Sequence, residues 1–431
     1  MSKFILVSPL LFIAFPAFAY LDPGSGNALV YLLVSLFGAV IYFLKSVFYR
    51  VFGFLRGEKS ETRKNDEIVI FSEGRNYWLT FKPILEELIN RNIPFTYLSM
   101  DVLDPALTID HPCMHSQYVG ENTSGFSRVA HAEGLIMLST TPNIGTKGFP
   151  LPRPKKISCL VHIWHSVSDT SFYHIGALDK YDVALTVGEC FIPSIRYIEE
   201  KRHLKAKEVI SVGLPYLDEL KANLNNNSQT DKSSTSKKTI LIAPSWGDKN
   251  CLAIYGYDFI KELATKGFYL IIRPHPQSLI VEKKFIENIK KDLSKFPNIS
   301  FDFDIDGSKS MQKADLLVSD KSSIRFDFAF LYEKPVLTLD IPLHDLNAYE
   351  ASILDELWEE THSERLGMRI TLEHKNNIVN AIQETLLITP QDIRSFRLET
   401  VSNWGHSSKE IVDWTLTKIQ KLKSSNTVLV K

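Results

Sequence analysis

Residues 314–340 read ADLLVSDKSSIRFDFAFLYEKPVLTLD, and this stretch decides the fold. The apolar run 316–318 predicts a strand, the residues after 323 an amphipathic helix, and 335–339 a second strand. This order is typical of a βαβ unit in a parallel sheet. The turn 319–323 carries small hydroxyl side chains at the start of the helix. Free backbone N–H groups and the helix dipole favour an anion there, so the turn predicts a phosphate site.

A second turn with anion-binding character follows another predicted strand, where residues 273–276 read Arg-Pro-His-Pro. The two prolines restrict the backbone, so the cationic side chains leave the strand end in a stiff geometry. Arginine binds phosphate oxygens through two parallel hydrogen bonds. The same residues could form only a rigid turn with a surface histidine. Together with the turn 319–323, they indicate a nucleotide-diphosphate site in one cleft.

The sequence His-Ile-Trp-His-Ser at residues 162–166 directly follows a predicted strand. Ligands and catalytic groups in open α/β sheets lie at the carboxyl ends of strands. His165 is therefore a candidate general base, because imidazole titrates near neutral pH. The alternative is a loop histidine that packs on Trp164. We count Trp164 and Ser166 as possible cleft residues.

Two further loops occupy the turn that faces the expected cleft. One follows the first strand of the second half and contains Pro244, Ser245 and Trp246. The other follows the first strand of the first half and contains Asn76. Either loop could be only a turn.

The pattern of strands and helices predicts an α/β protein with two Rossmann-like domains. We expect the first domain at residues 66–220 and the second at 239–388, followed by C-terminal helices at 389–431. Residues 221–238 are rich in Asn, Ser, Lys and Thr, and we interpret them as a mobile surface linker.

The N-terminus is apolar in two places, 4–15 and 28–44. Residues 1–19 are a signal peptide ending in a small-x-small site, or an uncleaved first segment of a two-helix hairpin. Residues 27–50 predict a transmembrane helix, since about 20 apolar residues span a bilayer. Cations gather after this segment, at Lys45, Arg50, Arg56, Lys59, Arg63 and Lys64. The positive-inside rule then predicts a single-pass inner-membrane protein with cytoplasmic catalytic domains.

Composition narrows the function classes. The 431 residues carry a formal net charge of -1, which gives no support for nucleic-acid binding. The four cysteines show no metal-ligand spacing and are typical of reduced thiols in the cytosol. They are Cys113, Cys159, Cys190 and Cys251. We predict neither a metal nor another cofactor.

An ordered set of motifs resembles the CDP-glycerol glycerophosphotransferase family, the polymerases and primases of teichoic acid synthesis. The motifs are Trp164-His165, Gly213-x-Pro215 with Asp218, Ala243-Pro244-Ser245-Trp246, His275-Pro276, Ser319-Asp320-x-Ser322-Ser323 with Phe326-Asp327, and Lys334-Pro335-Val336. The resemblance covers residues 68–387. It implies a glycosyltransferase-B-type fold, in which two Rossmann-like domains face a cleft.

The resemblance also implies a role for each matched position. His165 would take the proton of an acceptor hydroxyl, and His275, with Arg273, would hold the donor pyrophosphate. Ser322 and Ser323 would bind phosphate, and Asp320 would shape their turn. The donor would be CDP-glycerol or a related CDP-alditol, and CMP would leave. The acceptor would be a lipid-linked or polymeric glycan at the inner membrane.

The sequence departs from the family pattern at two places. Ser166 takes the position of a glycine, and Asp169-Thr170 occupies the region of a lysine. Two alternatives stay open. A glycosyltransferase that uses a nucleotide sugar would show the same phosphate-binding turns, since fold does not fix function. The change to Ser166 also leaves open a non-catalytic subunit of an envelope-polysaccharide complex. Glu333 is the one nearby acidic residue that could hold the hydroxyls of a donor sugar.

Overall fold

The computed structural model describes residues 66–226, 237–304, 307–342 and 347–429. These residues belong to one compact unit, Ser60–Lys431. The predicted segments 1–19 and 27–50 lie outside the described residues. Across the part of the chain that is described, no helix is long and apolar enough to cross a membrane.

The first half of the chain forms a seven-stranded parallel sheet in the order β3-β2-β1-β4-β5-β6-β7. Its strands are β1 (Ile68–Ser72), β2 (Phe95–Ser99), β3 (Met114–Tyr118), β4 (Glu133–Ser139), β5 (Lys156–Ile163), β6 (Val183–Thr186) and β7 (Glu208–Ser211). Strand order reverses between β1 and β4, and such a reversal opens a crevice at the carboxyl ends of the strands.

The second half forms a six-stranded parallel sheet in the order β10-β9-β8-β11-β12-β13. Its strands are β8 (Thr239–Ile242), β9 (Tyr269–Ile272), β10 (Ile299–Phe301), β11 (Leu316–Ser319), β12 (Val336–Leu339) and β13 (Arg369–Ile370). Its reversal point lies between β8 and β11. The prediction of two parallel α/β sheets is confirmed, whereas the exact domain bounds stay predictions.

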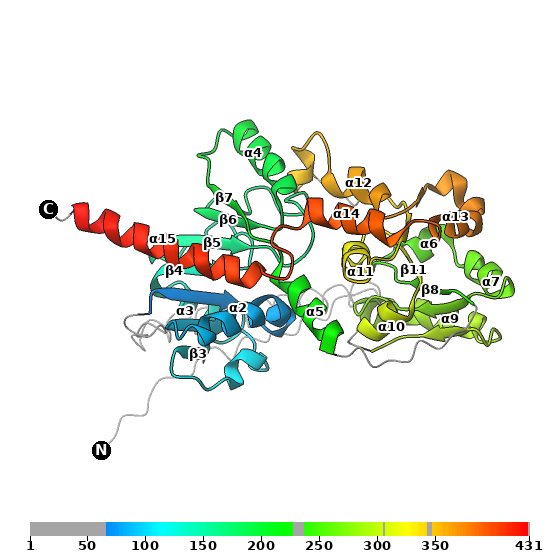
Figure 1. Cartoon of the computed structure of the whole chain (residues 1–431), viewed down its shortest axis with the longest axis horizontal. Helices are drawn as coiled ribbons and strands as arrows, with labels where there is room; N and C mark the ends of the chain where they lie inside the picture. Colours follow the sequence, from blue (N-terminus) through cyan, green and yellow to red (C-terminus); the bar gives the residue numbers. More distant parts are fainter. Residues whose placement is uncertain (1–65, 227–236, 305–306, 343–346, 430–431) are drawn as a thin grey trace, which may run out of the picture. The chain divides into compact units, whose positions relative to one another are not determined.

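Helices connect most successive strands (Figure 1), whereas loops alone join β4 to β5 and β5 to β6. The α-helices are α2 (Trp78–Asn90), α3 (Asn122–Val129), α4 (Ile192–Lys201), α5 (Pro215–Asn226), α6 (Cys251–Tyr255), α7 (Asp258–Thr265), α8 (Ser278–Val281), α9 (Lys283–Leu293), α10 (Ser308–Lys313), α11 (Ile324–Tyr332), α12 (Trp358–His362), α13 (Ile378–Thr385), α14 (Pro390–Thr400) and α15 (Ser407–Leu429). The 3-10 helices are η1 (Arg75–Tyr77), η2 (Pro105–Thr108), η3 (Glu189–Phe191), η4 (Glu350–Ser352), η5 (Ser363–Arg365) and η6 (Leu372–Asn377).

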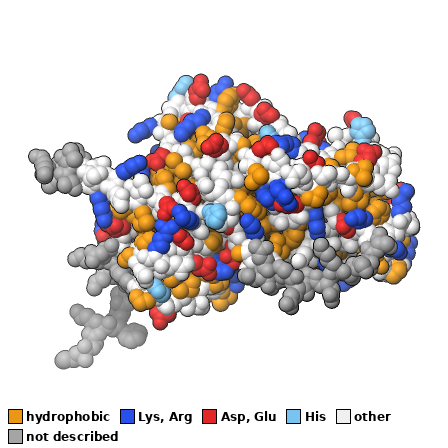
Figure 2. All heavy atoms as spheres, viewed as in Figure 1, with side chains coloured by type: hydrophobic (Ala, Val, Ile, Leu, Met, Phe, Trp, Pro, Cys, Tyr) orange, Lys and Arg blue, Asp and Glu red, His pale blue; other side chains and the backbone are white. Residues whose placement is uncertain are grey.

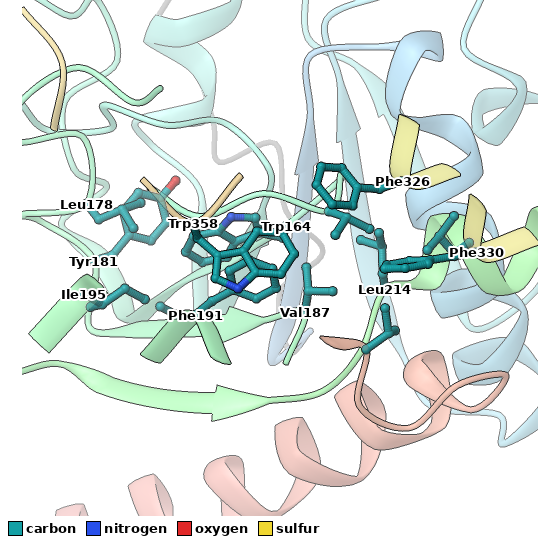
Figure 3. Packing of buried hydrophobic residues seen from close by; sticks show 14 of the residues in the cluster. Trp164, Leu178, Tyr181, Val187, Phe191, Ile195, Leu214, Phe326, Phe330 and Trp358 are labelled. Atoms are coloured by element: carbon teal, nitrogen blue, oxygen red, sulfur yellow. The ribbon is translucent and has the colours of Figure 1, made fainter. Parts of the chain in front are cut away.

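A buried aromatic cluster contains residues from the loops and helices that connect the strands of both sheets. The ring of Trp358 lies 4.6 Å from that of Phe191 and 5.3 Å from that of Phe326, centroid to centroid. Trp164 and Leu214 belong to the same cluster (Figure 3). Each such ring removes a large apolar area from water, so the cluster stabilises the contact between the halves.

The last helix returns to the first sheet. Ile411 and Ile419 of α15 are buried with residues of β1 and α2, and α15 runs beside β4 (Figure 1). Asp218 fixes this return, because its carboxylate accepts hydrogen bonds from the N–H groups of Gly405 at 2.6 Å and Ser407 at 2.8 Å. The motif Gly213-x-Pro215 with Asp218 therefore holds the start of α15.

Three expectations about elements were wrong or incomplete. The linker predicted at 221–238 begins too early, because α5 continues to Asn226. Leu217, Leu220 and Leu224 recur at helical spacing, and Leu224 lies inside the stretch whose polar composition suggested a linker. Strands β3 and β13 were missed, since β3 is a polar edge strand and β13 has only two residues.

Surface charge is mixed. Figure 2 shows acidic and basic side chains interspersed over one face of the molecule, with no large field of one sign. This distribution agrees with the near-zero net charge of the sequence.

Candidate active site

Three loops of the second half meet at one edge of its sheet. They follow β8, β9 and β11, which are neighbours in the order β9-β8-β11 and run parallel. The Ser319 hydroxyl at the end of β11 donates to the carbonyl oxygen of Ala243 at 2.5 Å. The structure therefore brings the motifs at 243–248, 273–276 and 319–323 together.

Asp320 is fully buried and organises the loop after β8. Its carboxylate accepts from the N–H of Ser245 at 3.0 and 3.1 Å, and from the N–H of Cys251 at 2.9 Å. A carboxylate turned inward in this way orients backbone groups, and it presents no positive charge to a phosphate. Its part in the predicted phosphate site is thus to shape the turn.

His275 stands at the exposed side of the same edge. Its Nδ1 accepts from the N–H of Gln277 at 3.1 Å, which leaves Nε2 as the donor in the neutral ring. Burial holds the pKa of His275 below its ordinary value, and the charges of Asp320 and Glu282 offset only part of this lowering. The exposed Trp246 ring lies 6.4 Å from the imidazole, tilted by 33°.

Arg273 is tied down by an acidic partner. Its Nη1 donates to Asp302 at 2.7 Å, and only 9% of the residue is exposed. Gly307 lies so close that an added Cβ would meet the guanidinium at 2.6 Å. The ion pair supports the turn that carries His275. It also neutralises the guanidinium charge that we expected to hold the donor pyrophosphate.

Ser322 and Ser323 lie at the N-terminus of α11. Ser323 is exposed, occupies the N-cap position and makes no capping bond with its side chain. Ser322 is half-buried, and its carbonyl accepts from the N–H of Arg325. Lys321 lies between Asp320 and Ser322 in the sequence. Its ammonium group is paired with Asp340 at 3.3 Å and with Glu360 at 3.1 Å.

The first sheet places His165 just beyond β5. Its ring meets that of Tyr77 edge-on, with 5.1 Å between centroids and 88° between planes. Burial lowers the pKa of His165, so the imidazole is neutral and able to accept a proton at neutral pH. The sequence did not indicate Tyr77, because it contacts His165 only once the folded sheet places the loop after β1 near the loop after β5.

The neighbours of His165 have structural roles. Trp164 is 1% exposed and stacks on Tyr173 at 5.9 Å, so it is a core residue rather than an open cleft residue. His162 shares a 2.9 Å hydrogen bond with the Tyr173 hydroxyl, and burial lowers its pKa to about 3. Ser166 is half-buried, and its hydroxyl bonds that of Ser168 at 3.0 Å.

Asn76 lies in η1, exposed, on a loop that is held rigidly. Arg75 binds Asp101 through Nε at 2.5 Å and Nη2 at 2.9 Å, and this hydrogen bonding lowers the pKa of Asp101 to about 2. Gly74 has φ of 134° and packs against the Cβ of Asp101. The loop between β1 and Tyr77 is therefore held in one position.

Several buried ionisable groups have shifted pKa values that the sequence did not indicate. The Tyr216 hydroxyl of α5 donates to Asp327 of α11 at 3.4 Å, and burial raises the pKa of Asp327 to about 7. Burial also raises the pKa of Glu359 to about 8, beside Arg325 at 3.6 Å. Asp169, in the region of the expected lysine, is buried as well, and burial raises its pKa.

Within the four described segments, no three His, Cys, Asp or Glu side chains gather in a way that could hold a metal ion.

Comparison with known proteins gives a family and a fold. The family model "CDP-Glycerol:Poly(glycerophosphate) glycerophosphotransferase" matches residues 178–398. No curated protein sequence matches the chain. Among solved structures, the wall teichoic acid polymerase TagF is similar with a TM-score of 0.55 and 17% identity, covering 89% of this chain and 98% of TagF. UDP-GlcNAc 2-epimerase from Methanocaldococcus jannaschii, in complex with UDP-GlcNAc and UDP, is similar with a TM-score of 0.53 and 12% identity. The match covers 81% of this chain and 99% of the epimerase chain. These structures show the fold, which is of the glycosyltransferase-B type.

Proposed function

Because the chain belongs to the CDP-glycerol:poly(glycerophosphate) glycerophosphotransferase family and is a CDP-glycerol transferase, we propose the following reaction. It transfers glycerol phosphate, or a related alditol phosphate, to a hydroxyl of a cell-envelope glycan or lipid-linked acceptor, and releases CMP. The hydrophobic N-terminal segment would hold it at the inner membrane, with the catalytic domains in the cytoplasm.

The observation that carries the proposal is the meeting of three loops at one sheet edge. Asp320 holds the loops after β8 and β11 together by accepting the N–H groups of Ser245 and Cys251, so these two donors are already used. The donors left for a ligand are the ring N–H of His275 and the groups of Ser322 and Ser323 at the N-terminus of α11. Such fixed donors favour a pyrophosphate and stabilise charge on the oxygens of a phosphoryl group in transfer. Lys321 and Arg273 have acidic partners and support these loops.

In the proposed reaction, the acceptor oxygen attacks the β-phosphorus of the donor. The bond between that phosphorus and the bridging oxygen breaks, and the electron pair leaves with CMP. The imidazole of His165 takes the proton of the hydroxyl as the new P–O bond forms. Its lowered pKa supports this role, since a base must be unprotonated before the reaction.

The glycosyltransferase alternative receives no specific support. Glu333 is bonded by Arg394 Nε at 2.9 Å and by Arg397 Nη1 at 2.9 Å. Its carboxylate therefore has cationic partners already and is not a free acceptor for sugar hydroxyls. The non-catalytic alternative rested on Ser166, and a serine there leaves His165 beside Tyr77.

The test is nucleotide release by the full chain in detergent. CDP-glycerol, CDP-ribitol and a panel of UDP-sugars are each supplied with an extract of envelope lipids and glycans. We expect CMP from a CDP-alditol, lost in His165→Ala and His275→Ala but retained in His131→Ala, an exposed histidine elsewhere. Release of UDP from a sugar, with no CMP from either alditol, would contradict the proposal.

A further inference from the structure

The most exposed pair of consecutive aliphatic side chains in the described residues lies directly after the Arg-Pro-His-Pro turn. Ile280 is 75% and Val281 62% exposed, and both belong to α8. Trp246 is 51% exposed in the neighbouring loop. We propose that α8 and Trp246, here called the α8 tip, insert into the headgroup region of an anionic lipid bilayer. This inference rests on the proposed function only in taking the adjoining cleft as the donor site.

The two parts of the α8 tip form one rigid unit. Glu282 directly follows Val281 and accepts from the N–H of Gly247 at 3.0 Å, which is the residue after Trp246. It also accepts from Asn250 at 3.2 Å and from the Ser278 hydroxyl at 2.6 Å. Single exposed apolar side chains are normal on protein surfaces. A fixed tip with two aliphatic side chains and a tryptophan is a different feature. Because the tip is held rigidly, a change in the conformation of one side chain does not remove its apolar surface from water.

Charge next to the tip fits an anionic surface. The helix that follows, α9, reads KKFIENIKKDL and has an excess of two positive charges. Its lysines at 283, 284, 290 and 291 are exposed. Interfacial elements of peripheral proteins combine aliphatic and tryptophan side chains with Lys and Arg, since the former enter the headgroup region and the latter attract anionic lipids.

A similar pair occurs in the first half. Val102 is 59% and Leu103 63% exposed, directly beyond β2. β2 lies beside β1 as β9 lies beside β8, so the two pairs occupy the same topological position in their sheets. In both sheets, the carboxyl edge that carries the candidate site also carries the exposed aliphatic side chains. This repetition, with the predicted membrane segment of the same chain, favours a bilayer over a protein partner.

Tryptophan fluorescence can test the inference directly. The six tryptophans all lie in described residues, none of them in 1–65, and Trp246 is the only exposed one. The full chain is reconstituted in vesicles of phosphatidylglycerol and phosphatidylcholine, with or without lipids brominated near the headgroup. Bromine quenches a tryptophan only at close contact, and the signal of Trp246→Phe gives the contribution of the other five.

We expect brominated lipid to quench the wild type more strongly than Trp246→Phe. The double variant Ile280→Ser with Val281→Ser should lose most of this difference, while Leu387→Ser, an equally exposed control at 79%, should keep it. Equal quenching of the wild type and Trp246→Phe overturns the inference. It is also overturned if the double variant of the α8 tip changes the oligomeric state and leaves the quenching as it is in the wild type. Because the readout is fluorescence, the inference can fail while CMP release succeeds, and the reverse is equally visible.

Discussion

The backbone N–H of Ser245 donates to both carboxylate oxygens of Asp320, at 3.0 and 3.1 Å. These residues lie at the ends of β8 and β11, and the contact converts two separate turns into one rigid edge. A second N–H, that of Cys251, donates to the same carboxylate at 2.9 Å. The donor side of the candidate site therefore depends on one buried acidic group that does not need to touch the donor.

Replacing Asp320 should damage stability and donor binding together. Asp320→Ala leaves the half-buried N–H of Ser245 and the buried N–H of Cys251 without an acceptor, and a buried group in this state costs about 1–3 kcal/mol. Asp320→Asn keeps one acceptor oxygen and should lose less. Urea unfolding measures the stability and CMP release measures the activity, with the exposed Asp248→Asn of the same loop as the control. Equal stability of Asp320→Ala and the control would refute this role.

Replacing His165 should remove the base. We expect His165→Ala to lower kcat by about 10²–10⁴-fold, the usual contribution of general base catalysis. In the wild type, burial lowers the pKa of His165 from the ordinary 6.5, so the acid limb of the pH–rate profile should lie below that pH. The profile of His165→Gln should lack this limb. An acid limb that persists in His165→Gln would assign the base to another group.

Asp327 should make stability depend on pH. Burial raises its pKa from 3.8 to about 7, so the folded state binds a proton that the unfolded state releases. The contribution of Asp327 to stability should therefore be fully present below pH 3.8 and be lost as pH rises to about 7, by roughly 1.4 kcal/mol per pH unit at most.

The comparison for Asp327 is with a neutral residue of the same shape. Asp327→Asn removes the titration, so its melting temperature should exceed that of the wild type increasingly as pH rises from 3.8 to about 7. The difference should then stay constant at higher pH. Parallel melting curves at every pH would show that Asp327 does not titrate with a raised pKa.

Gly74 should tolerate no side chain. Its φ is 134°, and an added Cβ would collide with that of Asp101, so Gly74→Ala should displace the loop that carries Asn76. Gly148→Ala is the matched control, since Gly148 also has positive φ, 91°, but nothing lies within 4 Å. Backbone strain alone costs about 1–3 kcal/mol. Thermal unfolding should show a larger loss for Gly74→Ala, and an equal loss would mean that the loop adapts.

The sequence alone determined most of the strands and the polar residues at their ends. Apolar runs such as 68–71, 156–163 and 336–339 became strands because their side chains can be buried on both faces of a parallel sheet. Small, hydroxyl and proline residues ended those runs, and in an α/β fold such ends lie at one edge. His165, His275 and the serines at 322 and 323 were found in this way.

Only the tertiary structure decided what each of these side chains does. Trp164 and His165 are consecutive, yet one is core and the other meets Tyr77. Arg273 pairs with Asp302, although the local sequence suggests that Arg273 binds phosphate, and Asp320 reaches across to Ser245 of another loop. The same holds for α15, whose attachment to Asp218 crosses nearly two hundred residues. Such contacts depend on which strands become neighbours, and that order comes from packing of the whole chain rather than from local pattern.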